Sequence, residues 1–424
     1  MAKRKVKILM LGFDDNNLLG HVYETYKSLP EDFEKKLVVL RHLNGGNLYS
    51  KFKTNSFLGR FSYKLYIKFN GLKRFLQTRS RRFVDNNKLE YCFAGNEFGG
   101  ISAKKILDEC KEFKPDIISI HWVANFITSK TIRDLYELTN AQLCFFFVDE
   151  AHLTGGCHYP VECEKYKNGC HECPALIKGK QQVAEIQMRL KNIYLSNLPK
   201  IVVGSPYDCR KAKDSSIFRE ATFYPYVEVP RVVIKPLEEA RKYFCLSKNE
   251  FVIMLGAASL NDKRKGLKYS VQAIKKFAKM HPDVCILAPG CNGLVLQKAL
   301  NGIKVVNPGY IDINKLFMAF CASNCFLSTT IADSGPMMVN YSIATGTPVV
   351  SFNLGIAQDL VLHKQTGYTA KYKDVDDLFD GIEFIYKSDQ SVLRQNCKSL
   401  MKHFSDMPKW YELLYSDYIA NILH

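Results

Sequence analysis

The sequence predicts an α/β protein of two domains, each built on a parallel sheet covered by helices. The chain has 424 residues, and one hydrophobic core rarely organises more than about 250–300 residues. Short apolar runs alternate with stretches of helical period, as βαβ units do. The same alternation begins again after a proline-containing stretch at residues 207–237, which we take as the linker between the domains.

In the first half, apolar runs predict strands, and apolar residues recurring every three or four positions predict helices. We expect strands at residues 6–11, 37–40, 91–94, 116–121, 141–148 and 201–204. We expect helices at residues 23–27, 101–113, 131–138 and 181–195.

The second half repeats this pattern and ends in two helices. We expect strands at residues 251–256, 284–288, 304–306, 325–329 and 348–352. We expect helices at residues 238–244, 268–280, 313–322, 337–344, 375–386, 395–404 and 410–423. The last helix is so apolar that it must be buried, and we expect it to cross back onto the first domain. The predicted divisions are therefore residues 1–205, 206–404 and 405–424.

The formal net charge of +17 is unevenly distributed. No acidic residue lies between Glu34 and Asp85, where basic residues alternate with aromatic ones. This composition suits an anionic membrane surface or an anionic lipid-linked substrate. A solvated helix with inward-facing aromatic rings is the alternative, although it does not account for the missing acidic residues. We expect no nucleic-acid partner, because no known nucleic-acid-binding module accompanies the stretch. From residue 51 onward its basic members are Lys51, Lys53, Arg60, Lys64, Lys68, Lys73, Arg74, Arg79, Arg81 and Arg82.

Location is predicted from what the chain lacks. No run reaches the roughly 18 apolar residues of a membrane-spanning helix, and the short apolar run at residues 6–12 is followed by Asp14 without a cleavage site. We expect a cytoplasmic protein, with peripheral attachment to the inner face of the plasma membrane as a further option. In that compartment the 14 cysteines are expected to be thiols or metal ligands rather than disulfides.

Residues 329–352 form the most informative segment. The order is strand, tight turn at Gly335 and Pro336, helix, glycine stop and strand. In open α/β sheets, ligands bind where such loops leave the carboxyl ends of the strands. The free N–H groups at the start of the helix suit a diphosphate.

This segment resembles the family 4 retaining glycosyltransferases of the GT-B fold, which build surface polysaccharides and glycolipids. The resemblance rests on the Asp-Ser-Gly-Pro turn at 333–336, the Gly-Thr-Pro-Val-Val run at 346–350 and the Lys-Arg-Lys-Gly element at 263–266. It implies two Rossmann-like domains facing across a cleft, the first for the acceptor and the second for the nucleotide-sugar donor. It also implies that Lys265 holds the donor phosphate, with Arg264 assisting.

The chain departs from that family at two acidic positions. The usual pair of glutamates falls at Ala332 and Asn340. The resemblance makes Asn340 the residue that holds the nucleotide ribose, and an amide can still form that hydrogen bond. Ala332 can contact neither sugar nor ribose through a polar group. Asp333 either substitutes for the missing sugar-contacting glutamate or caps the following helix.

Residues 118–122 and 148–159 match one branch of the family, in which His-Asp usually ends the strand. Here the pair is Val148-Asp149. Asp149 remains the preferred catalytic or sugar-binding carboxylate. His121 and His152 are alternatives, although an isolated histidine is more often structural.

Four clustered cysteines, Cys157, Cys163, Cys170 and Cys173, follow Asp149. Four thiolates can close a tetrahedral zinc site, so we expect a structural zinc, with free thiols as the alternative. Four protein ligands leave no open position, so we expect no catalytic metal there. The resemblance to GT-B enzymes, in which cationic side chains take the place of a metal, implies that no cofactor is required for catalysis.

The resemblance implies transfer of a hexose, with retention, from a nucleotide sugar to a glycan or polyprenyl-diphosphate-linked acceptor in surface polysaccharide biosynthesis. Two alternatives are open. The first is a catalytically weakened homologue that serves as a partner subunit, suggested by Val148, Ala332 and Asn340 together. The second is a GT-B nucleotide-sugar epimerase.

Overall fold

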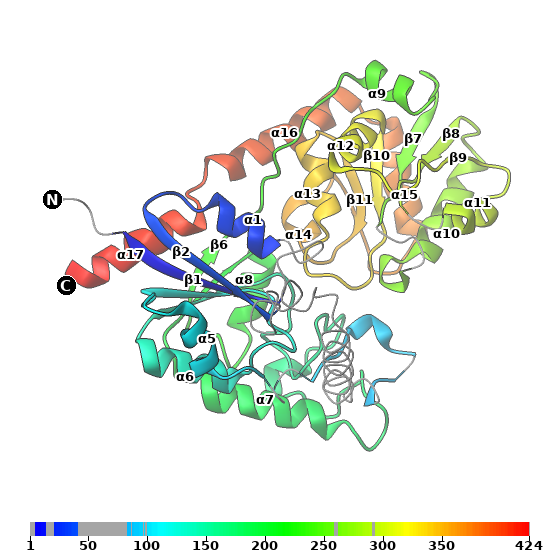
Figure 1. Cartoon of the computed structure of the whole chain (residues 1–424). Helices are drawn as coiled ribbons and strands as arrows, with labels where there is room; N and C mark the ends of the chain where they lie inside the picture. The colour runs from blue at the N-terminus through cyan, green and yellow to red at the C-terminus, as the bar shows by residue number, and fades with distance from the viewer. Residues whose placement is uncertain are drawn as a thin grey trace, which may run out of the picture. The chain divides into compact units, whose positions relative to one another are not determined.

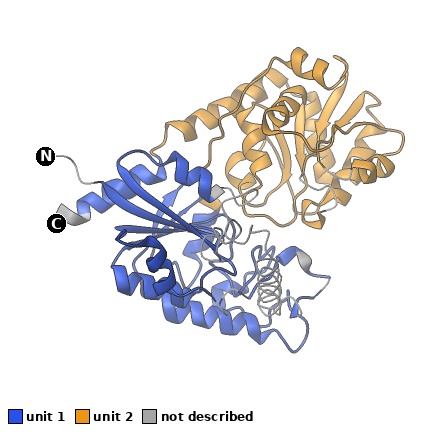
Figure 2. Cartoon of the chain, viewed as in Figure 1, with its two compact units in different colours: residues 1–204, 208–226, 409–424 blue, residues 205–207, 227–408 orange. Residues whose placement is uncertain are grey.

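The computed structural model describes residues 5–13, 21–40, 83–257, 262–290 and 293–423, apart from positions 86, 96, 98 and 99. The basic residues at 51–82 lie outside the described residues, so the predicted membrane surface is not described either. The chain forms two compact units (Figure 2). Unit 1 comprises residues 1–204, 208–226 and 409–424, and unit 2 comprises residues 205–207 and 227–408.

Unit 1 contains a six-stranded parallel sheet in the order β2-β1-β3-β4-β5-β6. Its strands are β1 (Val6–Gly12), β2 (Phe33–Val39), β3 (Ile117–Ile120), β4 (Gln142–Phe146), β5 (Lys200–Gly204) and β6 (Thr222–Pro225). Its helices are α1 (His21–Ser28), α5 (Ala103–Cys110), α6 (Ser129–Thr139), α7 (Gln182–Leu195), α8 (Pro206–Lys213) and α17 (Trp410–Leu423).

Both faces of the unit 1 sheet are covered. Successive residues of a strand point to opposite sides of the sheet, so each strand contributes side chains to two clusters. Leu9 and Leu11 of β1 pack in the cluster that includes residues of α5, α6 and α7. Ile8 and Met10 pack in a second cluster, with residues of α1 and α17. Figure 1 shows α5, α6 and α7 on one side of the sheet and α1 and α17 on the other. The last helix is thus part of the core of unit 1.

Unit 2 contains a second six-stranded parallel sheet, in the order β12-β11-β10-β7-β8-β9. Its strands are β7 (Phe251–Met254), β8 (Val284–Leu287), β9 (Lys304–Val306), β10 (Cys325–Ser328), β11 (Val349–Phe352) and β12 (Gly367–Ala370). Its helices are α9 (Leu237–Tyr243), α10 (Leu267–Ala278), α11 (Gly293–Ala299), α12 (Ile313–Ala322), α13 (Met337–Ala344), α14 (Ala357–Leu360), α15 (Val375–Lys387) and α16 (Gln390–Asp406).

The strand order of unit 2 is that of a Rossmann-like sheet. From β7 the chain proceeds outward through β8 and β9, then returns to β10 on the other side of β7 and continues to β11 and β12. Ligands of such sheets bind beyond the carboxyl ends of the strands where the order reverses. In unit 2 this position lies beyond β7 and β10, the two strands followed by the Gly256 and Asp333 loops.

The predicted fold class, α/β with two Rossmann-like domains, is confirmed, but several elements differ from the prediction. Residues 91–94 form no strand: Tyr91 ends a short 3-10 helix, and Phe93 makes an isolated bridge with Cys157. The predicted linker at 207–237 contains α8 and β6, so the first unit extends past residue 205 to Tyr226. No helix in the described part of the chain is long and apolar enough to cross a membrane.

The α10–α15 contact in unit 2 contains a buried acidic side chain, Glu383, which contacts His281 and pairs with Lys387 at 2.7 Å. Burial raises the pKa of Glu383, but hydrogen bonds from Lys387 and His281 outweigh burial and hold this pKa below its usual 4.5. The stabilisation is therefore present above pH 4.5 and is lost as the pH falls through the folded-state pKa.

We expect Glu383→Gln to lower the free energy of unfolding at neutral pH by about 2 kcal/mol, as for hydrogen bonds to charged groups. Urea denaturation at decreasing pH should show this loss shrinking toward zero below the folded-state pKa. Asp376→Asn is the matched control, because Asp376 also joins α15 to α10 through Lys276 but is exposed. It should cost less than about 0.5 kcal/mol. Equal losses for the two variants would contradict the role assigned to Glu383.

Candidate functional site

The loop between β10 and α13 ends in a turn that starts the helix. Asp333 accepts a hydrogen bond from Gly335 N at 3.3 Å, and Pro336 is the N-cap residue of α13. Proline suits a helix start because its fixed φ matches the helix and its missing N–H would have no partner there. The turn therefore brings the free N–H groups of the first turn of α13 beside the carboxyl ends of β10 and β11.

Lys265 reaches this turn from the segment after β7, the strand beside β10 at which the strand order reverses. Lys263–Lys265 form a 3-10 turn that Asp262 caps by accepting from Arg264 N at 3.0 Å. Lys265 Nζ lies 2.7 Å from Asp333 Oδ2. Arg264 Nη2 lies 2.8 Å from Asp262 Oδ2. The structure thus brings together the predicted donor-binding residues Lys265 and Arg264 with Asp333.

Gly266 makes this approach possible. Its φ is +64°, and a Cβ there would lie 2.0 Å from Thr329 O. The Thr329 hydroxyl lies 3.1 Å from the carbonyl oxygens of both Lys265 and Gly266, to which it donates. Ile331 N–H donates to Arg264 O at 2.7 Å. Only glycine combines this backbone conformation with so close an approach.

Two adjoining pockets open beside this turn in unit 2. One is lined by residues that include Gly256, Lys265, Thr330 and Pro336. The other is lined by residues that include Thr330, Pro336, Asp333 and Ser351. Ser351 is 2% exposed, and its hydroxyl has no hydrogen-bond partner among the described residues. The sequence alone did not indicate Ser351, which follows the β11 apolar residues without any distinguishing spacing.

Asn340 and Ala332, the positions expected for the two glutamates, do not line either pocket. Asn340 is 1% exposed, and its Nδ2 donates to Glu228 O at 2.8 Å. Ala332 is fully buried. The amide of Asn340 therefore ties α13 to the segment before α9, and the ribose contact predicted for it stays a prediction.

In unit 1, Asp149 follows β4 and forms a buried pair with His158. Asp149 Oδ2 lies 2.5 Å from His158 Nδ1, and its Oδ1 accepts from Ala151 N at 2.9 Å. Burial raises the pKa of Asp149, but the charge and hydrogen bond of His158 and the Ala151 amide outweigh burial and keep this pKa below its usual value. Asp149 is therefore ionised at neutral pH. The sequence analysis gave His158 no role, although it lies within residues 148–159, immediately after Cys157.

The two alternative histidines have structural contacts. His121 is 1% exposed, stacks on Phe146 and lies 3.0 Å from Ser119 Oγ through its Nε2. His152 donates from Nε2 to His121 O at 3.1 Å, and burial lowers its pKa to about 4, so the ring is neutral. A pocket of unit 1 is lined by residues that include Asp149 and His152, but not His121.

The same pocket is lined by two ionisable groups that the sequence did not reveal, the partly buried Glu97 and the buried Lys191. Glu97 Oε2 accepts from Ser129 N at 2.9 Å, at the start of α6. Lys191 Nζ donates to the carbonyl oxygens of Ala151 at 2.5 Å and Thr154 at 2.7 Å. Burial raises the pKa of Glu97 and lowers that of Lys191. Their partners lie far apart in the sequence, so no local pattern marks them.

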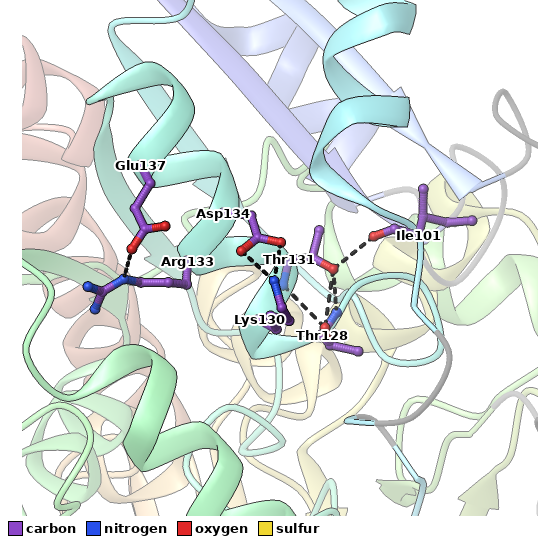
Figure 3. A network of polar contacts seen from close by, with 7 residues as sticks. All are labelled: Ile101, Thr128, Lys130, Thr131, Arg133, Asp134 and Glu137. Carbon is purple, nitrogen blue, oxygen red and sulfur yellow. Dashed lines mark hydrogen bonds and ion pairs between the residues drawn. The ribbon is translucent and has the colours of Figure 1, made fainter.

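The start of α6, which borders this pocket, is held by a capping box. Thr128 accepts from Thr131 N at 3.2 Å, and Thr131 Oγ1 donates to Ile101 O at 2.8 Å (Figure 3). Farther along the helix, Lys130 pairs with Asp134 on the exposed surface. The cap fixes the N–H group of Ser129 toward the Glu97 carboxylate, which the positive end of the helix also stabilises.

The four clustered cysteines are free thiols. Cys157, Cys170 and Cys173 are buried, and Gly155 N donates to Cys170 Sγ at 3.1 Å. Burial, together with the neighbouring thiols, raises the pKa of Cys157 well above its usual value. Within the described residues, no group of three or more His, Cys, Asp or Glu side chains could hold a metal ion. The structural zinc expected at Cys157, Cys163, Cys170 and Cys173 gains no support from this geometry and stays a prediction.

One comparison with known proteins finds a family to which part of unit 2 is similar. Residues 250–388 match the family model described as "Glycosyl transferases group 1", a segment that includes Lys265, Asp333 and α13. This segment of unit 2 is therefore similar to group 1 glycosyltransferases. A search of curated proteins finds no match.

Solved structures give the fold of the whole chain. Anabaena Alr3699/HepE in complex with UDP is 14% identical, with 99% of each chain covered and a TM-score of 0.57. A glycosyltransferase from Rickettsia africae ESF-5 is 14% identical over 94% of each chain, with a TM-score of 0.56. A sucrose-phosphate synthase from Thermosynechococcus elongatus is 17% identical over 76% of this chain and 77% of that one, with a TM-score of 0.54. At these identities the likeness establishes the fold, GT-B, as the sequence predicted.

We expect Gly266→Ala to lower the free energy of unfolding by at least about 3 kcal/mol, because left-handed strain adds to a backbone clash with Thr329. Gly302→Ala is the matched control: Gly302 has φ +86°, but nothing lies within 4 Å of an added Cβ. The control should lose about 1 kcal/mol from strain alone. Urea denaturation measures both losses. Losses of equal size would mean that the contact with the end of β10 is not close.

Proposed function

We propose that the chain is a glycosyltransferase that uses a nucleoside-diphosphate sugar, with the donor bound in unit 2. The observation that carries the proposal is Lys265, whose ammonium reaches the start of α13 at the switch point of the sheet. The cation, the free N–H groups of the helix and a pocket beside both suit a diphosphate. The group 1 family match covers all of these residues.

The proposed chemistry is departure of a nucleoside diphosphate from the sugar, assisted by groups already in position. Lys265 and the N-terminal turn of α13 would stabilise the negative charge that develops on the leaving phosphate. Arg264 would add a second cation nearby. We further propose that the anomeric configuration is retained, that the sugar is a hexose and that the chain falls in family 4, as the Asp-Ser-Gly-Pro and Gly-Thr-Pro-Val-Val segments suggest.

The acceptor is proposed to bind unit 1. Its pocket combines the Trp122 ring with the carboxylates of Asp149 and Glu97. Aromatic faces and carboxylates are suited to sugar rings and hydroxyl groups. A glycan or polyprenyl-diphosphate-linked acceptor in surface polysaccharide biosynthesis, at an anionic membrane surface, is the proposed setting. The basic and aromatic residues at 51–82 support it through their composition.

The alternative of a catalytically weakened partner subunit keeps one supporting observation. The Asn340 amide donates to Glu228 O and does not line either pocket, whereas the resemblance assigns it a contact with the nucleotide ribose. Donor turnover separates the alternatives. A partner subunit gives no hydrolysis or transfer, whereas a nucleotide-sugar epimerase gives an altered sugar nucleotide and consumes no acceptor.

The donor site is tested by titrating the full chain with a panel of nucleoside-diphosphate sugars in a calorimeter. We expect at least one to bind, and Lys265→Ala to weaken it at least tenfold, roughly the 1.4 kcal/mol contribution of a charge-assisted contact. Lys276→Ala is the control, because Lys276 pairs with Asp376 on the surface of the same unit. It should leave the affinity unchanged. Failure of every donor to bind or turn over would sink the enzyme proposal.

For unit 1, we expect Asp149→Asn to lower kcat/KM by about a hundredfold, the usual size of a lost acid–base or orienting carboxylate. Its donor affinity should stay unchanged, which would also show that unit 2 is folded. Asp134→Asn removes a carboxylate from the exposed Lys130 pair of unit 1 and should keep full turnover. Full turnover by Asp149→Asn as well would remove Asp149 from the catalytic machinery.

A further inference from the structure

The carboxylate of Asp333 contacts two different kinds of anion-binding group. Its Oδ2 lies 2.7 Å from the Lys265 ammonium, and its Oδ1 accepts from Gly335 N at 3.3 Å. A diphosphate on this turn would use a lysine ammonium and backbone N–H groups in the same way. Asp333 therefore makes the contacts that an anionic ligand would make.

The Asp333–Lys265 ion pair is partly shielded from solvent. The side chain of Asp333 is 13% exposed and that of Lys265 is 27% exposed. Water and salt screen such a pair less than a fully exposed one. The neighbouring cation is also neutralised within the chain, since Arg264 pairs with Asp262. Two cations of the Lys-Arg-Lys-Gly element, Arg264 and Lys265, thus have internal carboxylate partners.

The pocket beside Asp333 is lined by a hydroxyl that has no hydrogen-bond partner among the described residues. The Ser351 hydroxyl, on a side chain 2% exposed, has no hydrogen-bond partner among the described residues, and Ser351 lines the pocket together with Asp333 and Pro336. A buried hydroxyl without a partner is costly. A ligand oxygen that entered this pocket would satisfy it.

We propose that Asp333 is an internal counter-ion that occupies the anion position and is displaced from Lys265 when the donor diphosphate binds. This inference rests on the proposed function and deepens it. Asp333 is then a residue that sets donor affinity and favours ligands of high negative charge. It does not contact the transferred sugar, which distinguishes this role from the sugar-contacting role considered from the sequence.

The test is calorimetric titration of the full chain with inorganic pyrophosphate and with UDP. We expect Asp333→Asn and Asp333→Ala to bind pyrophosphate about five- to tenfold more tightly than the wild type, because the ligand no longer competes with a carboxylate for Lys265. Asp376→Asn breaks a Lys–Asp pair of unit 2 away from the site and makes the same change in net charge. It should bind within about twofold of the wild type. Thermal melting of each variant confirms that it is folded.

Turnover provides a second readout. With a donor that the wild type uses, Asp333→Asn should lower KM and leave kcat within about threefold. A loss of kcat without tighter binding would reassign Asp333 to the sugar and overturn the proposal. So would unchanged or weaker pyrophosphate binding by both Asp333 variants. If the wild type binds neither pyrophosphate nor any nucleoside-diphosphate sugar, the donor site itself is wrong, a different failure from that of the counter-ion.

Discussion

The close contact between the 264–266 turn and the end of β10 determines where Lys265 lies relative to α13. Hydrogen bonds from Thr329 and Ile331 hold the carbonyl oxygens of this turn, and the left-handed Gly266 allows the approach. The 264–266 turn follows β7, whereas Thr329 and Ile331 follow β10. The contact therefore joins the two neighbouring strands at which the strand order of the sheet reverses. The main chain at Lys265 is therefore held against the end of β10 by one main-chain bond, from Ile331, and by the hydroxyl of Thr329, which is 2% exposed.

The pocket of unit 1 differs from those of unit 2 in that several ionisable groups with little exposure line it. Glu97, Asp149 and Lys191 lie in an interior where an unpaired charge is costly. Each has a partner: Ser129 for Glu97, His158 for Asp149, and two carbonyl oxygens for Lys191. Such networks lower the cost of burial and fix the loops that supply them. The polar groups of this pocket thus come from three separate segments of unit 1, and each is hydrogen-bonded.

The sequence predicted the fold well because period and composition are local properties. The final helix was predicted at residues 410–423, and α12, α13 and β9 were also predicted within their observed bounds. Residues 91–94 misled because apolar side chains packed around Cys157 do not require a strand. Lys265 and Gly266 were singled out through the resemblance of residues 263–266 to a family element, and the phosphate contact of Lys265 stays a prediction. Glu97, Lys191 and Ser351 were not singled out, since their significance comes from distant partners. Likewise, a position on α13 did not indicate where the Asn340 amide points.

The placement of α17 affects the order in which the protein can fold. Trp410 and Leu414 are buried in the same cluster as Ile8 and Met10 of β1. Domains usually fold as they emerge from the ribosome, beginning with the N-terminal one. Here the first unit to be synthesised is the last to be completed, because α1 covers only part of one sheet face and the rest stays uncovered until residue 414 has been added. Unit 2 has all of its own strands before then. While unit 2 is being synthesised, the nascent chain therefore exposes the apolar part of the unit 1 sheet that α17 covers in the folded protein.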